Sequence, residues 1–390
     1  MNNKGSIFSF FIVVLFLTRL VPLNAYSVVM NMALAAFFLF NSNAIMKNCR
    51  KTPEVGLVFA ATTSCVLLLV IYSVSLGNEI GLIARFALIL FLIMSAYLVS
   101  PSESYISIFL FFITIQALLV IGMEGYLVLN FDIDSYLPIR HVIKKNGWGD
   151  VYTFNGVFWR IQLIGSALLP FALFVSVAIF SGLKRVVFCL LFSSAIICAG
   201  NFAFVLGVVI FLLMYWVYNL DFSKRKVVIS GGLFLLLIIV TIFPSYSYIE
   251  RVIKEKSISS NPIRIDQAVV LINDMSEEVS TVVFGKGLGS TVDIETDWRD
   301  YSGDIYFELQ ALYFLNQMGV LLFTAFILLN VFFAWYFIRH KLLLITYFSY
   351  IFYASFNPYF LDTNHVVVII VLLSLRKVLD GKNILVTRGV

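Results

Sequence analysis

The sequence predicts an all-α integral membrane protein of about twelve transmembrane helices, built as a single polytopic membrane domain over residues 1–390. Hydrophobic residues make up 61% of the chain and charged residues 13%, whereas soluble domains have roughly 45–50% and about 25%. Apolar runs recur along most of the chain, and basic residues gather in short clusters between them. A soluble fold could not bury so much apolar surface, because burial is limited by the ratio of surface to volume.

Each transmembrane helix needs about 20 apolar residues to cross about 30 Å of hydrocarbon. On this criterion we place the helices near residues 6–22, 26–45, 55–75, 80–99, 104–122, 157–182, 186–199, 202–219, 227–244, 308–338, 342–357 and 363–376. Lys4 followed by an apolar run resembles a signal peptide, but a second run starts almost at once, so we expect an uncleaved first helix. Residues 186–220 form one long apolar run, which we divide at Gly200-Asn201.

The distribution of lysine and arginine predicts the orientation, because short cytoplasmic loops carry an excess of these residues. The five basic clusters, each of which follows an even-numbered helix, are Lys47, Arg50 and Lys51; Lys184 and Arg185; Lys224, Arg225 and Lys226; Arg339 and Lys341; and Arg376 and Lys377. One orientation satisfies all five clusters, with these loops and both termini in the cytoplasm. The division at Gly200-Asn201 is required for this agreement.

Two long segments then lie on the opposite, extracytoplasmic face. Residues 123–156 form the first long loop, between the fifth and sixth helices, and residues 245–307 form the second, partly helical loop, between the ninth and tenth. Both loops are mixed in charge, so the lysine and arginine bias does not assign them to the cytoplasm. We expect the protein to function at this face, because these two loops are the longest segments outside the predicted helices.

The two loops carry residues that are candidates for catalysis or ligand binding. The second loop contains Arg264 in an Asn-Pro-Ile-Arg sequence, a glycine-rich turn over residues 284–290, and Glu308 at the start of the tenth helix. The first loop returns to the membrane through residues 155–160, which places Arg160 near the outer end of the predicted sixth helix. An ionisable residue at such a position is a candidate for function.

These motifs, in this order, resemble the O-antigen polymerase (Wzy-type) branch of the O-antigen ligase/polymerase superfamily. The shared features are Arg160 followed by a glycine and a proline, an arginine-bearing periplasmic loop, a Phe-Gly-Lys-Gly-Leu-Gly-Ser turn, a Glu–Gln–Gly helix behind it, and Asn-Pro-Tyr at 357–359. Ligases of the superfamily usually have a histidine about eleven residues before the glycine that Gly319 matches, where this chain has Glu308. The chain therefore resembles the polymerases more than the ligases.

The resemblance implies glycosyl transfer at the periplasmic face of the bacterial inner (cytoplasmic) membrane, within lipopolysaccharide and surface polysaccharide biosynthesis. The donor would be the growing polysaccharide on undecaprenyl pyrophosphate. The acceptor would be the non-reducing end of a new lipid-linked repeat unit. The expected partners are this lipid-linked oligosaccharide, membrane lipid and a chain-length regulator protein, and neither a metal nor another cofactor is expected.

The candidate residues suit this chemistry. Arginine stays charged and binds phosphate oxygens through paired hydrogen bonds, so Arg160 and Arg264 are the predicted catalytic groups that stabilise the pyrophosphate leaving group. Glu308 is the predicted catalytic base for the acceptor hydroxyl. The predicted substrate-binding residues are Arg251, Arg85, Gly287, Gly289 and Gln310. Each of these residues has a structural alternative: Arg160 as a snorkelling arginine, Arg264 as a solvated loop charge and Glu308 as a carboxylate at a helix start. The alternative for the glycines is a tight turn, and the alternative for Arg85 is an ion pair with Glu79.

Other classes of protein fit the sequence less well. The alternatives are an O-antigen ligase and a lipid-linked oligosaccharide flippase or other transporter, but transporters tend to have internal repeats and charges along a central cavity, and the sequence shows neither. Nucleic-acid binding is disfavoured despite a net charge of +5, because the basic residues do not form one face. The four cysteines have neither a disulfide pattern nor a metal-ligand spacing.

Reporter fusions test the predicted topology. Fusions after Lys51, Lys184, Lys226 and Lys341 should report a cytoplasmic location, and fusions after Asn146 and Ser276 should report a periplasmic one. Each fusion site should be tested with two reporters, one active only in the cytoplasm and one active only outside it. At each site one reporter should be active and the other inactive, so each serves as the control for the other. A cytoplasmic signal at Ser276 would contradict both the topology and the enzymatic interpretation.

Overall fold

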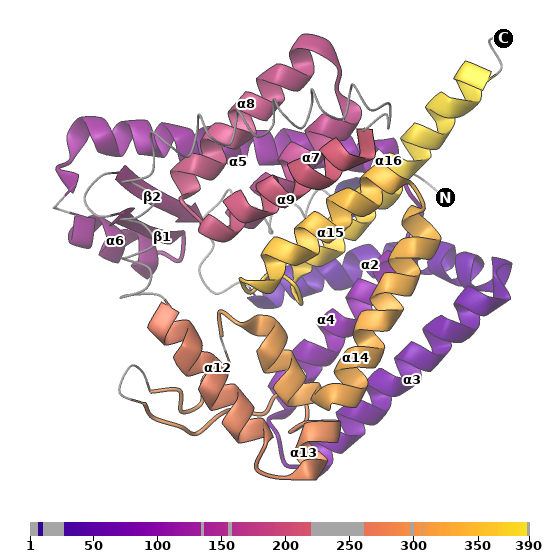
Figure 1. Ribbon diagram of the computed structural model, residues 1–390. Coiled ribbons are helices and arrows are strands. Elements are labelled where there is room, and N and C mark those ends of the chain that lie inside the picture. Colours follow the sequence, from indigo (N-terminus) through magenta and orange to yellow (C-terminus); the bar gives the residue numbers. More distant parts are fainter. Residues whose placement is uncertain are drawn as a thin grey trace.

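The computed structural model describes residues 7–10, 27–133, 136–154, 158–219, 261–296, 300–305 and 307–387. Most of these residues are helical (Figure 1). In chain order the helices are α2 (Ser27–Lys51), α3 (Pro53–Ser75), α4 (Ile80–Ala96), α5 (Glu103–Asn130), α6 (Tyr136–Lys145), α7 (Leu169–Ile179), α8 (Gly182–Ala199), α9 (Phe202–Asn219), α12 (Asn261–Met275), α13 (Val279–Phe284), α14 (Gln310–Ile338), α15 (Lys341–Ser355) and α16 (Thr363–Thr387). Strands β1 (Gly149–Phe154) and β2 (Phe158–Leu163) form a hairpin between α6 and the 3-10 helix Ser166–Leu168.

Five helices among the described residues are long and apolar enough to cross a membrane: α3, α5, α8, α9 and α14. Helix α4 and the segment Ser166–Ile179 are shorter apolar helices. Large hydrophobic side chains such as Leu57, Leu68 and Trp335 are 65–73% exposed on these helices. Such surface is unfavourable in water and suits contact with lipid tails. The structure is therefore that of a helical, membrane-embedded protein.

Many predicted helix positions agree with the observed ones. The predicted helix 202–219 coincides with α9, and the predicted helix 55–75 starts two residues inside α3. The division at Gly200-Asn201 is confirmed, because Gly200 has a φ of +59° and ends α8 in the left-handed conformation that favours glycine. The predicted helix 227–244 and most of the predicted helix 6–22 lie outside the described residues, so the total of about twelve stays a prediction.

The predicted sixth helix, which we placed at 157–182, begins too early. Residues 158–163 form β2, which pairs antiparallel with β1, and α7 begins only at Leu169. Trp159 and Ile161 are buried, while Arg160 between them is partly exposed, and this period of two suits a strand. Arg160 therefore lies on a hairpin and not near a helix end, and this hairpin forms a two-stranded sheet within a mostly helical chain.

Helix α14 is interrupted at Gly319, whose φ of +67° and ψ of 169° are not helical. An interruption leaves carbonyl groups of the preceding turn without helical partners. The glycine-rich turn supplies the missing donors, since the backbone N–H groups of Lys286 and Gly287 donate to the carbonyls of Asn316 and Gln317, at 3.0 and 2.9 Å. The second long loop is thus anchored inside a predicted membrane helix.

The glycine-rich turn also binds the connection between α3 and α4. The Tyr72 hydroxyl donates to the Gly285 carbonyl at 3.0 Å, and the Leu288 N–H donates to the Ser73 hydroxyl at 2.7 Å. The Asn78 side-chain amide donates to two carbonyls of the same turn. Three segments that are far apart in the sequence are therefore held together at this point.

Helix α12 packs on the first part of α14. The Gln267 Oε1 atom accepts hydrogen bonds from the N–H groups of Glu308, at 3.1 Å, and Leu309, at 3.4 Å. These N–H groups belong to the start of a helix, where intrahelical acceptors are absent. At the C-terminal end of α12, Asp274 accepts hydrogen bonds from Asn316 at 2.8 Å and from the Lys286 ammonium at 2.7 Å. The middle and the C-terminal end of α12 are thereby fixed to α14 or to the glycine-rich turn.

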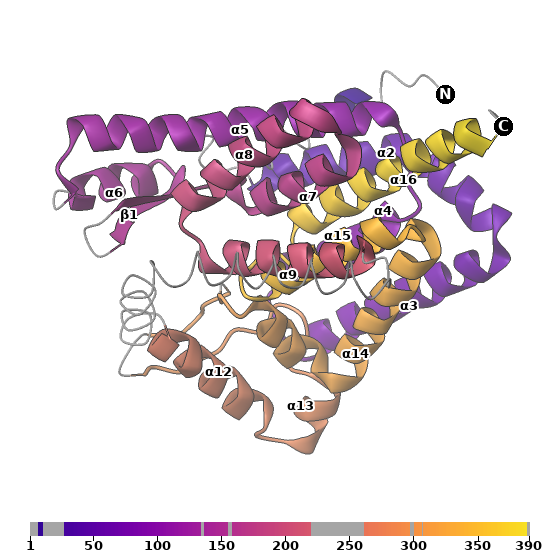
Figure 2. The ribbon, with the colours of Figure 1, turned by 45° about the horizontal axis from the view of Figure 1, so that its top comes forward.

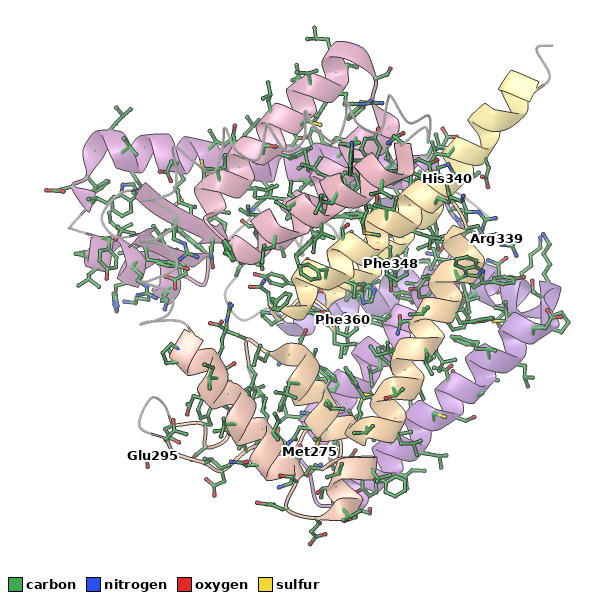
Figure 3. All side chains as sticks on the ribbon, viewed as in Figure 1. Met275, Glu295, Arg339, His340, Phe348 and Phe360 are labelled. Carbon is green, nitrogen blue, oxygen red and sulfur yellow. The ribbon has the colours of Figure 1, made fainter. Side chains whose placement is uncertain are left out.

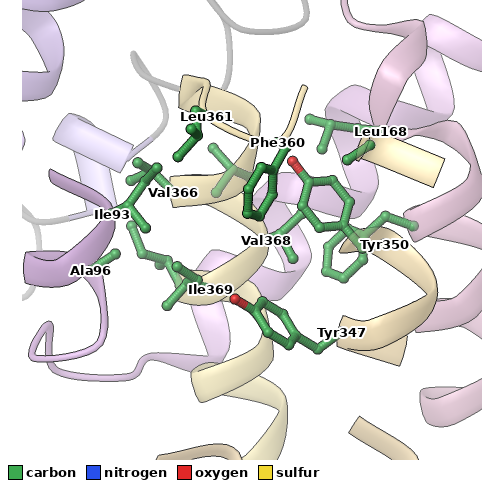
Figure 4. Close-up of a cluster of buried hydrophobic side chains, with 14 of the residues drawn as sticks. Ile93, Ala96, Leu168, Tyr347, Tyr350, Phe360, Leu361, Val366, Val368 and Ile369 are labelled. Carbon is green, nitrogen blue, oxygen red and sulfur yellow. The ribbon is translucent and has the colours of Figure 1, made fainter. Parts of the chain in front are cut away.

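The centre of the core lies around α16, whose residues 363–375 are all buried. Figure 4 shows Tyr347 and Tyr350 of α15 and Ile93 of α4 around the α16 residues Val366 and Ile369. A helix that is covered on all sides must be apolar nearly all round, as this one is. The few polar side chains in it are hydrogen-bonded, and one of them is His365, which contacts the Tyr347 hydroxyl at 2.9 Å and the Phe360 carbonyl at 2.8 Å.

The molecule has two different ends. Arg339 and His340 lie at the connection between α14 and α15, whereas Met275 and Glu295 of the second loop lie far from them (Figure 3). Figure 2 shows α6, the hairpin and α12 on the side of the molecule remote from the C-terminus. The described parts of both long loops therefore gather at one end, as the predicted topology requires.

Replacing Gly319 with alanine should destabilise the protein. An added Cβ would lie 2.4 Å from both the Gly285 nitrogen and the Val283 carbonyl oxygen, and alanine disfavours a φ of +67°. Left-handed strain and overpacking each cost about 1–3 kcal/mol. We therefore expect a lower midpoint of thermal unfolding for the purified protein in detergent.

Gly125→Ala is the matched control for this variant. Gly125 lies in α5, and a Cβ added there has no neighbour within 4 Å. Alanine at this helical position should be neutral or stabilising, because glycine disfavours a helix by roughly 0.5–1 kcal/mol. Equal unfolding midpoints for the two variants would contradict the importance of the interruption at Gly319.

Candidate functional site

Two predicted catalytic residues, Arg264 and Glu308, form an ion pair. The Arg264 Nε atom lies 2.8 Å from the Glu308 Oε2 atom. Arg264 is in the first turn of α12 and Glu308 lies two residues before α14, so the packing of α12 on α14 through Gln267 sets the distance between them. The two side chains are 32% and 43% exposed. The pair is therefore accessible to a ligand.

The third predicted catalytic residue, Arg160, lies on one face of the hairpin. Arg160 is paired across the strands with Tyr152, and its guanidinium carbon lies 4.4 Å from the centre of the Tyr152 ring. Val151, Trp159 and Ile161 on the opposite face are buried in a cluster with side chains of α5. Burial of that face fixes the register of the strands, and it presents Tyr152 and Arg160 together on the other face.

The stem of Arg160 also contacts the turn between α8 and α9. A Cβ added at Gly200 would lie 2.6 Å from the Arg160 Cγ atom and 2.9 Å from its Nε atom. A residue larger than glycine would displace this arginine. The glycine that separates the predicted seventh and eighth helices therefore forms one wall around Arg160, and the Tyr152 ring forms another.

Electrostatic interactions connect the hairpin with the ion pair. Burial raises the pKa of the Tyr152 hydroxyl, and the positive charge of Arg160 opposes this rise. The negative charges of Asp150 and Glu308 raise the same pKa further. Since the charge of Glu308 acts on Tyr152, the hairpin face lies within electrostatic range of the ion pair. Figures 1 and 2 accordingly show the hairpin and the start of α12 at the same end of the molecule.

Basic side chains surround Asp150, the one carboxylate of the hairpin, and their positive charges exceed its negative charge. Arg140 of α6 donates through Nε and Nη2 to the two carboxylate oxygens of Asp150, at 2.8 and 2.9 Å. The Lys144 Nζ atom lies 3.2 Å from the same carboxylate. With Arg160 included, this group has three positive charges and one negative charge. The hairpin face is therefore electropositive and suits an anionic ligand.

Arg85 lies on α4, and its charge acts on the N-terminus of α16. Burial raises the pKa of Asp362, while hydrogen bonds from Thr363 and Asn364 and the charge of Arg85 lower it. Arg85 is exposed, and no hydrogen bond or ion pair joins it to another of the described residues. Its guanidinium is therefore accessible to a lipid headgroup or a substrate, and its predicted substrate contact stays a prediction.

The structure gives three other predicted substrate-binding residues clear structural contacts. Cβ atoms added at Gly287 and Gly289 would lie 2.8 and 2.9 Å from the side chains of Asn78 and Leu82. The Gln310 amide accepts from the Leu361 N–H and donates to its carbonyl, at 3.0 and 3.3 Å. These contacts give each of the three residues a structural role that requires no ligand. Their contacts with a substrate stay a prediction. Arg251 lies outside the described residues.

Sequence reasoning missed Tyr152 and Gln267, which position the predicted catalytic groups. The signal for Tyr152 was present, because Asn155-Gly156 between two alternating runs is typical of a β-hairpin. A two-residue turn at Asn155-Gly156 would place Tyr152 opposite Trp159, so only the observed register, which pairs Phe154 with Phe158, places Tyr152 opposite Arg160. No local pattern marks Gln267, since its partners, Glu308 and Leu309, are more than forty residues away in the sequence.

The part of the chain that the structure describes contains no group of three or more His, Cys, Asp or Glu side chains that could hold a metal ion. Its candidate groups are arginines, a carboxylate and a tyrosine. No protein-family model matches the chain, and no curated protein matches it either. The function proposed next therefore rests on the residues and their arrangement.

Proposed function

We propose that this protein is an O-antigen polymerase, which transfers the growing polysaccharide from undecaprenyl pyrophosphate to the non-reducing end of a new lipid-linked repeat unit. The observation that supports it best is the convergence of Arg160, Arg264 and Glu308. These residues come from two loops that are separated by about a hundred residues, and each was selected from the sequence for a role in this reaction. Structural charges of unrelated origin would have no reason to meet at one end of the molecule.

The arginines suit the leaving group. As the bond between the anomeric carbon and the phosphate oxygen breaks, the electron pair leaves with the pyrophosphate, whose developing charge needs fixed cations. Arginine binds two phosphate oxygens in parallel and remains charged. Arg264 is held by Glu308 before substrate binds, so a bound pyrophosphate would compete with the carboxylate for this guanidinium.

Glu308 suits the acceptor. The acceptor hydroxyl must transfer its proton as its oxygen bonds to the anomeric carbon, and a positioned carboxylate can accept that proton. The contact between the Glu308 N–H and Gln267 fixes the backbone from which the carboxylate extends. Acid and base partners placed in this way typically contribute ~10²–10⁴-fold to a rate.

The proposed enzyme is embedded in the bacterial inner membrane. About twelve transmembrane helices would hold both termini in the cytoplasm and the site at the periplasmic face of the inner membrane. The partners would be the lipid-linked oligosaccharide, membrane lipid and a chain-length regulator protein. A ligase or a flippase would share the helices and the lipid, and the glutamate at position 308 together with the charges at one end of the molecule favours the polymerase.

Glu308→Gln should abolish chain extension while leaving the amount of protein nearly unchanged. The amide keeps the size of the side chain but cannot accept the proton. Glu308→Asp should retain partial activity, because a shift of ~1 Å can cost ~10²-fold. The measurement is the O-antigen ladder of a deletion strain complemented with each variant. A normal ladder from the glutamine variant would show that Glu308 is not the catalytic base and only stabilises the start of the helix.

Exchanging the ion pair separates structure from catalysis. In the double variant Arg264→Glu, Glu308→Arg the two charges can pair again, so a purely structural ion pair would be restored. The proposed function requires an arginine at 264 and a carboxylate at 308, so the double variant should fold with nearly wild-type stability and lack chain extension. Recovery of the ladder in the double variant, after its loss in both single variants, would contradict the catalytic roles.

The polysaccharide profile of a deletion strain distinguishes the alternatives. Loss of a polymerase should leave lipid A-core that carries a single repeat unit. Loss of a ligase should leave lipid A-core without a repeat unit, and loss of a flippase should give the same core with lipid-linked intermediates retained inside the cell. Either of the last two profiles would overturn the proposed function.

A further inference from the structure

Arg160 can bind an anion efficiently only if its guanidinium is held in place before the anion arrives. The arginine side chain has many rotamers, and fixing one of them on binding costs conformational entropy. A group that holds the guanidinium in advance removes this cost from the binding step. The structure shows such a group in Tyr152, which the sequence analysis did not select.

We propose that Tyr152 is a positioning residue, whose ring holds the Arg160 guanidinium in the orientation that binds the pyrophosphate of the lipid-linked donor. This inference rests on the proposed function. Two observations carry it: the two residues are directly opposite in the antiparallel register, and the guanidinium carbon lies 4.4 Å from the ring centre. Cation–π contacts of this kind occur within about 6 Å.

Contact with an aromatic ring suits an anion-binding arginine better than an ion pair does. A ring attracts the flat face of the guanidinium, whereas phosphate oxygens bind the N–H groups at its edge. The ring can therefore hold the ion without competing for the groups that bind the ligand. A carboxylate in the same place would occupy the edge and repel the pyrophosphate.

Arg140 illustrates the difference on the same ring. Its guanidinium carbon lies 5.4 Å from the Tyr152 ring centre, but two of its edge N–H groups donate to Asp150. Arg140 therefore neutralises the charge of the Asp150 carboxylate. The Arg160 guanidinium carbon lies closer to the same ring centre, at 4.4 Å, and the stem of Arg160 lies against Gly200.

Tyr152 also interacts electrostatically with the Arg264–Glu308 pair. The charge of Glu308 acts on the Tyr152 hydroxyl, so this hydroxyl lies within electrostatic range of the Arg264–Glu308 pair. The proposed function requires the two guanidiniums, one from each loop, to bind the same pyrophosphate.

Three variants isolate the contribution of the ring. Tyr152→Leu removes the aromatic face, and Tyr152→Phe keeps it and removes only the hydroxyl. Tyr126→Leu is the matched control, because Tyr126 is an exposed tyrosine on the neighbouring helix α5. The unfolding midpoint of each purified variant without ligand shows whether the hairpin still folds.

Binding of undecaprenyl pyrophosphate to the full chain in detergent is the direct readout. Tyr152→Leu should weaken binding by about tenfold, which corresponds to ~1.4 kcal/mol and lies within the range of partly buried cation–π contacts. Tyr152→Phe and Tyr126→Leu should bind within about twofold of the wild type. In an Arg160→Ala background, Tyr152→Leu should cause no further loss, because the two residues act as one unit.

The outcomes separate the inference from the proposed function. If Tyr152→Leu binds like the wild type, or if Tyr152→Phe loses as much as Tyr152→Leu, the ring does not position Arg160 and the inference fails while the function stands. Additive losses in the double variant also overturn it. If Arg160→Ala binds the lipid normally and polymerises normally, the proposed role of Arg160 fails, and the inference fails with it.

Discussion

The interruption of α14 at Gly319 determines how the outer half of the molecule is arranged. A continuous helix would satisfy its own carbonyls and leave no acceptors for another segment. Because the helix breaks, the carbonyls of Asn316 and Gln317 bind the glycine-rich turn, and that turn binds the connection between α3 and α4. The same anchorage holds α12 against α14, which brings Arg264 to Glu308.

The second constraint is the burial of one hairpin face. Val151, Trp159 and Ile161 pack against α5, and a strand that is buried on one side must present alternate residues on the other. Tyr152 and Arg160 therefore share the other face, where they are partly buried next to the Gly200 turn. The two loops use different means, a helix interruption and a half-buried strand pair, to bring charges to the same end of the molecule.

Helix positions followed from the sequence where the physics is local. A run of about 20 apolar residues has few alternatives in a membrane, so the predicted and observed positions of α3 and α9 agree closely. The helix prediction was wrong at residues 158–163, because an apolar run that continues from β2 into α7 suggested one helix. The alternation of Trp159, Arg160 and Ile161 and the Asn155-Gly156 pair indicated a hairpin, and the neighbouring membrane helix concealed that pattern.

Composition, run length and the basic clusters were sufficient to predict a helical membrane protein and to select Arg160, Arg264 and Glu308, because these properties depend on residue types and short spacings. The ion pair of Arg264 with Glu308, the contact of Arg160 with Tyr152 and the structural use of Gln310 depended on contacts between distant segments. Such contacts are set by which surfaces remain unsatisfied after the helices form, and here these were the carbonyls before Gly319 and the apolar face of the hairpin. No local pattern encodes a partner that lies forty or more residues away, so the assembly of the candidate site became visible only in three dimensions.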